Sequence, residues 1–194
     1  MARGRRVNSS GEKSKALLLE KAIEQFSTNG YHQTKISDIV KAANLTQPTF
    51  YLYFQSKESL FKDLNNEFKK ELFEIFDNGM VSAENLNAKE VIFNSLKGIF
   101  TYFVKNPNLT KIGFFESNEA EEVKAEMAQQ FVTLLQKDTS LVANKGVEKD
   151  ILAASLLGSI ERLTLTNLLN NSSTPEALAK QVINIYFEEQ KVLV

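Results

Sequence analysis

The stretch from Thr34 to Leu60 constrains the fold more than any other part of the chain. It opens with apolar residues at helical spacing, which are Ile36, Ile39, Val40 and Ala43. Asn44 follows them, and asparagine tolerates the left-handed backbone of a tight turn better than most residues. Thr46 can then cap a second helix by accepting a hydrogen bond from a free backbone N–H. The pattern predicts a helix-turn-helix with a further helix directly after it.

The second predicted helix, from Thr46 to Phe54, divides its residues between two roles. Phe50 and Phe54 lie four positions apart and would anchor the helix to a core. The other side chains with hydrogen-bonding groups include no acid: Thr46, Gln47, Thr49, Tyr51 and Tyr53. Gln pairs with adenine, Thr meets a base edge or a thymine methyl, and Tyr hydroxyls hold phosphates, so the set favours a helix that enters a DNA major groove. The alternative is an ordinary short helix with a polar outer face.

The sequence TxxSDIVKAANLTQPTFYLYFQSKESLF resembles the DNA-binding segment of the TetR family of bacterial transcriptional regulators. The resemblance includes the preceding ALLLEKAIEQFSTNGYHQT and covers Ala16 to Phe61. Asn44 stands where glycine is usual in the family, and Pro48 and Leu52 stand where many members carry small or basic residues. Asn44 preserves the turn. Leu52 removes a basic contact, so the operator sequence does not follow from the resemblance.

We expect one set of side chains to contact double-stranded DNA. Pro48 would lie in the first turn of the second helix, where its missing N–H costs little. The resemblance implies a phosphate contact for Lys57, and we expect Gln47 and Thr49 to read bases. The full set is Lys35, Ser37, Thr46, Gln47, Pro48, Thr49, Tyr51, Tyr53 and Lys57.

Charge is unevenly distributed along the chain. Residues 1–57 carry nine Lys or Arg against four Asp or Glu, a balance of +5, and because the whole chain has −1, the remainder carries −6. A basic segment on an acidic body suits a protein that meets DNA with one face. Arg3, Arg5 and Arg6 form either an arm that reaches the minor groove or backbone, or a solvated tail.

Composition predicts an all-α fold. The 194 residues include only 8 Gly and 3 Pro, and no strand-like alternation runs far. We expect an N-terminal three-helix DNA-binding head in residues 1–57, followed by a larger helical ligand-binding and dimerisation body in residues 58–194. With no cysteine, disulfides and thiolate zinc sites are excluded. The lack of a spanning apolar run or signal peptide predicts a cytoplasmic protein that does not enter a membrane.

Apolar periodicity and end signals predict the remaining helices. Gly and Pro mark several ends, at Asn29-Gly30, Asn78-Gly79 and Asn106-Pro107. The expected helices are Glu12–Thr28, Lys57–Asp77, Ala88–Lys105, Leu109–Glu116, Glu119–Lys137, Val147–Leu169 and Pro175–Lys191.

The predicted helices Val147–Leu169 and Pro175–Lys191 carry more apolar side chains than packing on one face of a core requires. This surplus indicates a protein–protein contact. The resemblance implies that these helices pair with their copies in a homodimer, and Gly158 would permit close helix approach. The residues expected at this contact are Leu156, Gly158, Leu163, Val182, Ile183 and Tyr186.

The resemblance also implies a pocket for a small-molecule effector among the middle helices, and 11 of the 14 phenylalanines follow residue 60. Bulky apolar walls would suit an apolar or aromatic ligand, although aromatic residues more commonly fill a helical core. Glu161 and Arg162 could anchor a polar group of that ligand, or could pair at a dimer contact. The expected ligand residues are Phe68, Phe100, Tyr102, Phe103, Phe114, Phe115, Phe131, Glu161 and Arg162.

The leading hypothesis is a homodimeric repressor that leaves a palindromic operator when an effector binds. A chromosome-organising DNA-binding protein without an effector is the alternative. An enzyme is disfavoured, since no catalytic set, zinc motif or nucleotide-binding loop is present, and we expect no cofactor and no metal. Four acids near a predicted helix start fit the electrostatics of a helix N-terminus better than a metal site: Glu116, Glu119, Glu121 and Glu122. We expect His32 to be a structural or solvated loop residue, whose only functional role would be a contact to DNA phosphate.

Overall fold

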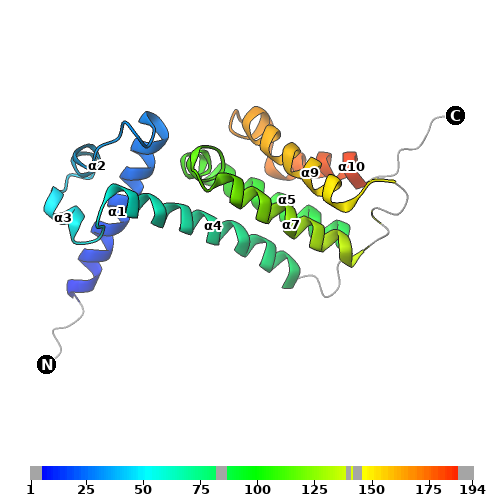
Figure 1. Ribbon diagram of the computed structural model, residues 1–194, viewed down its shortest axis with the longest axis horizontal. Coiled ribbons are helices and arrows are strands. Elements are labelled where there is room, and N and C mark those ends of the chain that lie inside the picture. The colour runs from blue at the N-terminus through cyan, green and yellow to red at the C-terminus, as the bar shows by residue number, and fades with distance from the viewer. Residues whose placement is uncertain (1–5, 82–86, 139–140, 142–145, 188–194) are drawn as a thin grey trace, which may run out of the picture. The chain divides into compact units, whose positions relative to one another are not determined.

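The computed structural model describes residues 6–81, 87–138, 141 and 146–187, and the regular structure within these ranges is entirely helical (Figure 1). The predicted all-α fold is therefore confirmed. Packing divides the chain into two compact units. We call Met1–Phe68 with Asn108–Ser117 the head, and Lys69–Pro107 with Asn118–Val194 the body. The functional division expected between residues 57 and 58 remains a prediction.

The head begins with α1 (Arg6–Asn29), which is longer than predicted at its N-terminal end. Gly30 ends the helix with a positive φ of 81°, and its N–H donates to the carbonyl of Phe26 at 2.9 Å. The buried hydroxyl of Thr34 then donates to the carbonyls of Gln25 and Gly30, at 3.2 and 2.9 Å. These bonds fix the loop that leads from α1 into α2 (Ile36–Ala42).

The turn between α2 and α3 (Gln47–Tyr51) has the predicted chemistry. Asn44 adopts a φ of 52°, and the N–H of Leu45 donates to the carbonyl of Val40 at 2.8 Å. Thr46 is the N-cap of α3, and its hydroxyl oxygen accepts from the N–H of Thr49 at 3.4 Å. The α-helix ends at Tyr51, earlier than the predicted Phe54, because the N–H of Leu52 bonds three residues back to Thr49 and tightens the last turn.

The head has an aromatic-rich core that holds these short helices together. The ring of Phe61 lies 5.3 Å from that of Phe26 in an edge-to-face arrangement and 4.5 Å from that of Tyr31. Phe50 and Phe54 anchor α3 and its following turn as predicted. The buried apolar residues here include Leu18, Ala22, Phe26, Ile39, Val40, Ala43, Phe50, Phe54, Leu60, Leu64 and Phe68.

A segment distant in sequence completes the head. The helix predicted at Leu109–Glu116 forms as α6 (Pro107–Thr110) followed by the π-helix η1 (Lys111–Glu116), in which the N–H of Ser117 donates to the carbonyl of Ile112 at 2.8 Å. The Lys111 ammonium donates to the carbonyl of Ser27 near the end of α1. Gly113 lies directly against the ring of Phe68 in α4 (Lys57–Val81).

The body consists of the second half of α4 with α5 (Ala88–Lys105), α7 (Ala120–Lys137), α9 (Lys149–Leu163), the π-helix η2 (Thr164–Leu168) and α10 (Pro175–Phe187). In the body, α5 packs against α7 and α10, and α7 packs against α9. The predicted bounds of α5 are confirmed. The helix predicted at Val147–Leu169 changes to π geometry at Thr164, whose hydroxyl donates to the carbonyl of Ile160 at 2.7 Å.

Apolar contacts and ion pairs join the second half of α4 to α5 and α7 of the body. Ile75 lies so close to α5 that a Cβ on Gly98 would be 2.6 Å from its Cγ2. The rings of Phe76 and Phe131 meet edge to face at 5.2 Å. The Lys69 ammonium pairs with Glu122 and Glu126 of α7, at 3.0 and 2.8 Å.

We expect Gly113→Ala to destabilise the protein, because the added Cβ would lie 2.5 Å from Cδ1 of the fully buried Phe68 ring. Overpacking of this kind costs about 1–3 kcal/mol in the free energy of unfolding, which urea denaturation would measure. Gly11→Ala is the matched control, since its Cβ would meet only the Tyr53 hydroxyl at 3.4 Å. Equal stability of the two variants would contradict the close η1–α4 packing.

Candidate nucleic-acid interface

The outer surface of α3 is accessible over most of its length. Thr46, Gln47 and Pro48 are exposed at its start. Tyr51 is 56% exposed and Leu52 is 76% exposed, whereas Phe50, which precedes them, is fully buried. The helix therefore presents amide, hydroxyl and apolar groups on a surface held in place by one buried aromatic ring. Such a surface can meet base edges, thymine methyl groups and phosphates.

Two of the expected DNA contacts, Thr49 and Tyr53, are less accessible than the start of α3. Thr49 is half-buried, and its hydroxyl lies 2.9 Å from the hydroxyl of Thr46. Tyr53 is also half-buried, with its hydroxyl near Gly11 of α1. The bond between the two hydroxyls orients Thr49. The DNA contacts of Thr49 and Tyr53 remain predictions.

The start of α2 presents the second part of the candidate interface. Lys35 and Ser37 are both exposed. The carboxylate of Asp38 accepts from the N–H of Lys35 at 3.0 Å, which satisfies one free donor at this helix end. The Lys35 ammonium is left at the surface, where it can meet a phosphate.

Lys57 is engaged inside the head. Its ammonium donates to the carbonyls of Tyr31 and Thr34, at 2.8 and 2.9 Å, and lies 4.3 Å from the centre of the Tyr31 ring. Lys57 thereby joins the loop between α1 and α2 to the start of α4, an arrangement that we call the Lys57 clamp. The phosphate contact that the resemblance implies for Lys57 is untested. A phosphate would have to compete with these carbonyls for the same N–H groups, so we expect the ammonium to stay with the carbonyls.

Neighbouring groups reinforce this junction. Ser56 and Ser59 cap α4 reciprocally, since each backbone N–H donates to the other hydroxyl, at 3.1 and 3.2 Å. The pKa of Glu58 lies below its ordinary value because of hydrogen bonds from Ser56, its own N–H and Tyr31. The pKa of Tyr31 is raised by burial and by its bond to Glu58. The junction is therefore a connected polar network.

Some expected DNA contacts lie at the edge of this surface or beyond it. Arg3 and Arg5 are outside the described residues, and Arg6 is the first residue of α1. His32 is exposed beside Tyr31, with ring centres 5.3 Å apart.

Comparisons with known proteins match this architecture. Residues 18–64 match the family described as bacterial regulatory proteins, tetR family. The uncharacterized HTH-type transcriptional regulator YdgC of Bacillus subtilis (strain 168) is 34% identical over 92% of this chain and 93% of its own. The chain belongs to the TetR family.

Solved structures show the same fold at lower identity. A TetR-like transcriptional regulator from Rhodococcus sp. RHA1 superposes with a TM-score of 0.76 at 18% identity, over 89% of this chain and 93% of that one. The regulator FadR from Bacillus subtilis, solved in complex with stearoyl-CoA, superposes with a TM-score of 0.70 at 23% identity, over 89% of this chain and 97% of its own. These structures show that the body has the TetR-like helical fold. As a member of the TetR family the chain is a DNA-binding transcriptional regulator, and the chromosome-organising alternative is not favoured.

The expected effector residues of this TetR-family regulator divide between the two units. Phe68, Phe114 and Phe115 belong to the head. The body contains the fully buried Phe100, Phe103 and Phe131, together with the half-buried Tyr102. Their contact with an effector remains a prediction.

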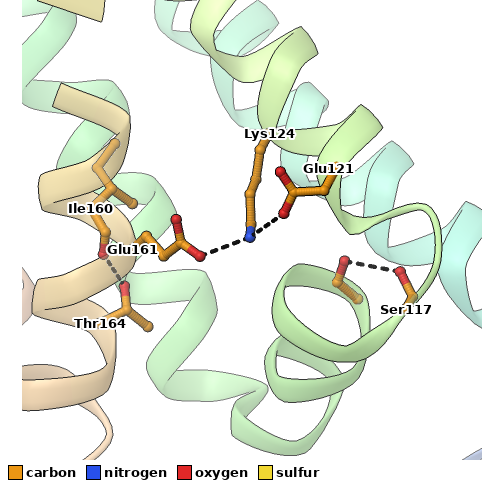
Figure 2. Close-up of polar contacts among 7 residues, drawn as sticks. Ser117, Glu121, Lys124, Ile160, Glu161 and Thr164 are labelled. Atoms are coloured by element: carbon orange, nitrogen blue, oxygen red, sulfur yellow. Dashed lines mark hydrogen bonds and ion pairs between the residues drawn. The ribbon is translucent and has the colours of Figure 1, made fainter. Parts of the chain in front are cut away.

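Glu161 has an internal partner in the body (Figure 2). Lys124 of α7, whose side chain is only 10% exposed, donates to Glu161 of α9 at 2.7 Å and to Glu121 at 2.8 Å. Burial lowers the pKa of Lys124, but the two carboxylates outweigh burial and hold the pKa above its ordinary value. Glu161 therefore fixes α9 to α7, whereas Arg162 is exposed.

Sequence reasoning missed Lys124, although a signal exists. Lys124 follows Ala120 by four residues and precedes Met127 and Phe131 at steps of three and four, so it occupies a position in the buried stripe of α7. A charged residue in such a stripe indicates a buried ion pair. The clamp formed by Lys57 has no comparable signal, because its partners are backbone carbonyls.

The expected dimer residues fall into two groups. Leu156 and Val182 are fully buried and Ile183 is 5% exposed, so these side chains belong to the core of the body and offer no surface to a second chain. Gly158 is exposed, and Leu163 and Tyr186 are half-buried. The Tyr186 hydroxyl joins α10 to α9 by donating to the carbonyl of Ser155 at 3.0 Å.

The described part of the chain lacks both a metal-binding cluster and a membrane-spanning helix. Within it, no three His, Cys, Asp or Glu side chains gather where they could hold a metal ion. None of its helices has the length and apolar character needed to cross a membrane.

Lys57→Met should lower the free energy of unfolding by about 1–3 kcal/mol, because two carbonyls lose their charged donor. It should leave the salt dependence of operator binding unchanged.

Lys35→Met should leave stability unchanged and reduce the slope of log affinity against log salt by about 0.9. Urea denaturation and binding titrations at several salt concentrations measure both effects.

Lys62→Met, at an exposed position of α4, is the matched control for both measurements. A reduced salt slope in folded Lys57→Met protein would show that this ammonium meets a phosphate and would contradict the clamp.

Proposed function

We propose that this protein is a homodimeric, cytoplasmic repressor that binds a palindromic operator and releases it when a long-chain acyl effector enters the body. The exposed polar surface of α3, anchored by the buried Phe50, is the observation that carries the proposal. Two copies of α3 would enter successive major grooves about one helical turn, or roughly 34 Å, apart.

The division of labour at the operator follows from the chemistry of the exposed groups. Gln47 pairs with a base edge, and Pro48 and Leu52 offer apolar contact to thymine methyl groups. Lys35, Ser37 and Tyr51 hold phosphates, which fixes the register of α3 on the duplex. Thr46 and Thr49 act as a pair, because their hydroxyls are bonded to each other.

The aromatic interior of the body supports an apolar effector. Phe76 and Phe131 pair between α4 and α7, and Phe100 and Phe103 are fully buried on α5. The structurally similar regulator FadR was solved in complex with stearoyl-CoA. We therefore propose a molecule with a long acyl chain as the effector of this protein. Effector binding would shift the population of conformers away from the one that fits the operator.

The accessible face of α9 and α10 supports a second copy of the chain as its partner. Ile151 and Gly158 of α9 and Leu165 of η2 are exposed at a spacing of seven residues, with the exposed Ser155 and Arg162 between them. Ile151 is 58% exposed and Ile185 of α10 is 66% exposed. A Cβ on Gly158 would meet nothing within 4 Å, so a partner helix can approach there. This accessible set carries the contact in place of Leu156, Val182 and Ile183.

The function is tested with a DNA fragment from upstream of the protein's own coding sequence. We expect the full chain to bind one palindrome in fluorescence anisotropy and to be released by stearoyl-CoA but not by coenzyme A alone. Gln47→Ala should change the ranking of operator variants, by about 1–3 kcal/mol at the affected base pair.

Each result has a distinct meaning. Similar affinity for unrelated sequences, without release by any acyl-CoA, would support the chromosome-organising alternative. Specific binding to a palindrome without release by stearoyl-CoA would contradict the effector class alone.

Ile185→Glu should separate the dimer, because two carboxylates would be buried against an apolar partner surface. We expect the dimer dissociation constant to rise on the order of 100-fold, measured by sedimentation equilibrium, with a parallel loss of operator affinity. Val104→Glu is the control, since Val104 is also exposed, at 37%, but lies on α5. An unchanged dimer in the Ile185 variant would contradict the proposed contact.

A further inference from the structure

One buried hydroxyl in the body lacks a hydrogen bond. Ser95 lies in the middle of α5 and is 1% exposed. Its Oγ finds no hydrogen-bond partner in the part of the chain that the structure describes. Burying a hydroxyl without a partner costs free energy, and native proteins seldom leave such groups unsatisfied.

Other hydroxyls in the helices of the body are satisfied locally. Thr101, Thr133, Thr164 and Thr166 each donate to the carbonyl four residues earlier, at 2.6 to 3.0 Å. Ser95 has the carbonyl of Val91 at the same offset and makes no such bond. Because a local bond is geometrically available to this kind of side chain, the direction of the Ser95 hydroxyl is a specific feature of the site.

The helical periodicity of α5 shows which neighbouring helix the face with Ser95 meets. Ser95, Gly98 and Tyr102 are separated by three and four residues, so they share one face of the helix. Gly98 on this face lies against Ile75 of α4, because its Cβ would be only 2.6 Å from that side chain. Ser95 therefore stands on the side of α5 that is turned toward the second half of α4.

The surroundings on that side are apolar and aromatic. Phe76, the residue after Ile75 in α4, packs on Phe131 of α7 with ring centres 5.2 Å apart. Ile92, Leu96 and Ile99 flank Ser95 on α5 and are fully buried. In such a low-dielectric interior a single hydrogen bond to a ligand is strong and discriminating.

We propose that Ser95 is the hydrogen-bond donor that recognises a carbonyl oxygen of the acyl effector. This inference rests on the proposed function, since it names a residue of the effector site and the chemical group that it reads. A carbonyl is a strong acceptor that lacks a proton, so it matches the unsatisfied hydroxyl. The acyl chain would be held by the aromatic residues, and Ser95 would distinguish an acyl thioester from an alkane or thioether of equal length.

The test is a thermodynamic cycle on the full-length protein with two probes. Stearoyl-CoA carries the thioester carbonyl, and S-octadecyl-CoA has the same chain and coenzyme without it. We expect the wild-type protein to bind stearoyl-CoA about 5- to 10-fold more tightly than the thioether, the value of one net hydrogen bond. Ser95→Ala should bind both probes equally, with the affinity of the wild type for the thioether.

The ligand-free protein supplies a second readout. Because Ser95→Ala removes an unsatisfied buried group, its melting temperature should equal or exceed that of the wild type. Thr101→Val is the matched control on the same helix, since the Thr101 hydroxyl bonds to Lys97 at 2.6 Å. We expect this control to leave the ratio of the two probe affinities unchanged.

The outcomes separate this inference from the function on which it rests. If the wild type binds stearoyl-CoA and Ser95→Ala keeps its preference for the thioester, the role of Ser95 is wrong and the effector class stands. A lower melting temperature of ligand-free Ser95→Ala, with equal weakening of both probes, would make Ser95 a packing residue and overturn the inference. No binding of stearoyl-CoA to the wild type would overturn both proposals.

Discussion

The contact between Phe68 and Gly113 is the constraint on which the construction of the head depends. The ring lies where any side chain on Gly113 would have to be, and it is fully buried. Burial of a phenylalanine contributes about 1.5–3 kcal/mol. The hydrogen bond from Lys111 to Ser27 is charge-assisted, but the Lys111 side chain is 49% exposed, so solvent weakens this bond. The apolar contact therefore holds η1 on α4, and the bond from Lys111 sets its position along α1. As a result, residues 108–117 belong to the same compact unit as the helix-turn-helix, and α4 has one half in each unit.

Local chemistry explains why much of the fold was predictable. The turn at Asn44 and the cap at Thr46 depend on neighbouring backbone groups. The sequence therefore predicts both, and both are present in the structure. The bounds of α5 follow in the same way, since Asn106-Pro107 cannot continue a helix. The change to π geometry at Lys111 and Thr164 was not predictable. A shift from i+4 to i+5 hydrogen bonds reflects packing against other helices, which residue spacing does not record.

The candidate site shows the same limit at the level of side chains. The exposure of Gln47 and Tyr51 follows from the phase of α3 relative to Phe50. The engagement of Lys57 does not, because its acceptors are carbonyls more than twenty residues away. The sequence predicted that α9 and α10 carry surplus apolar side chains, but it did not predict which of them are buried. Leu156 and Val182 lie in the core of the body, whereas Ile151 and Ile185 are exposed. That division depends on which face of each helix meets α5 and α7.

Ion pairs give α7 a particular place in the body. On one side its Glu122 and Glu126 hold Lys69 of α4, and the pKa of Lys69 is raised by Glu126 and Glu122 in turn. On another side its Lys124 holds Glu161 of α9, the helix that carries the proposed partner surface (Figure 2). The Lys69 pairs are partly solvated and worth little individually. The Lys124–Glu161 pair is more costly to break, since the Lys124 ammonium, only 10% exposed, would remain desolvated without its carboxylates. Apolar burial supplies the stability, and the ion pairs fix register. A ligand that displaced α7 would therefore move α9 with it before the Lys124 pair separated.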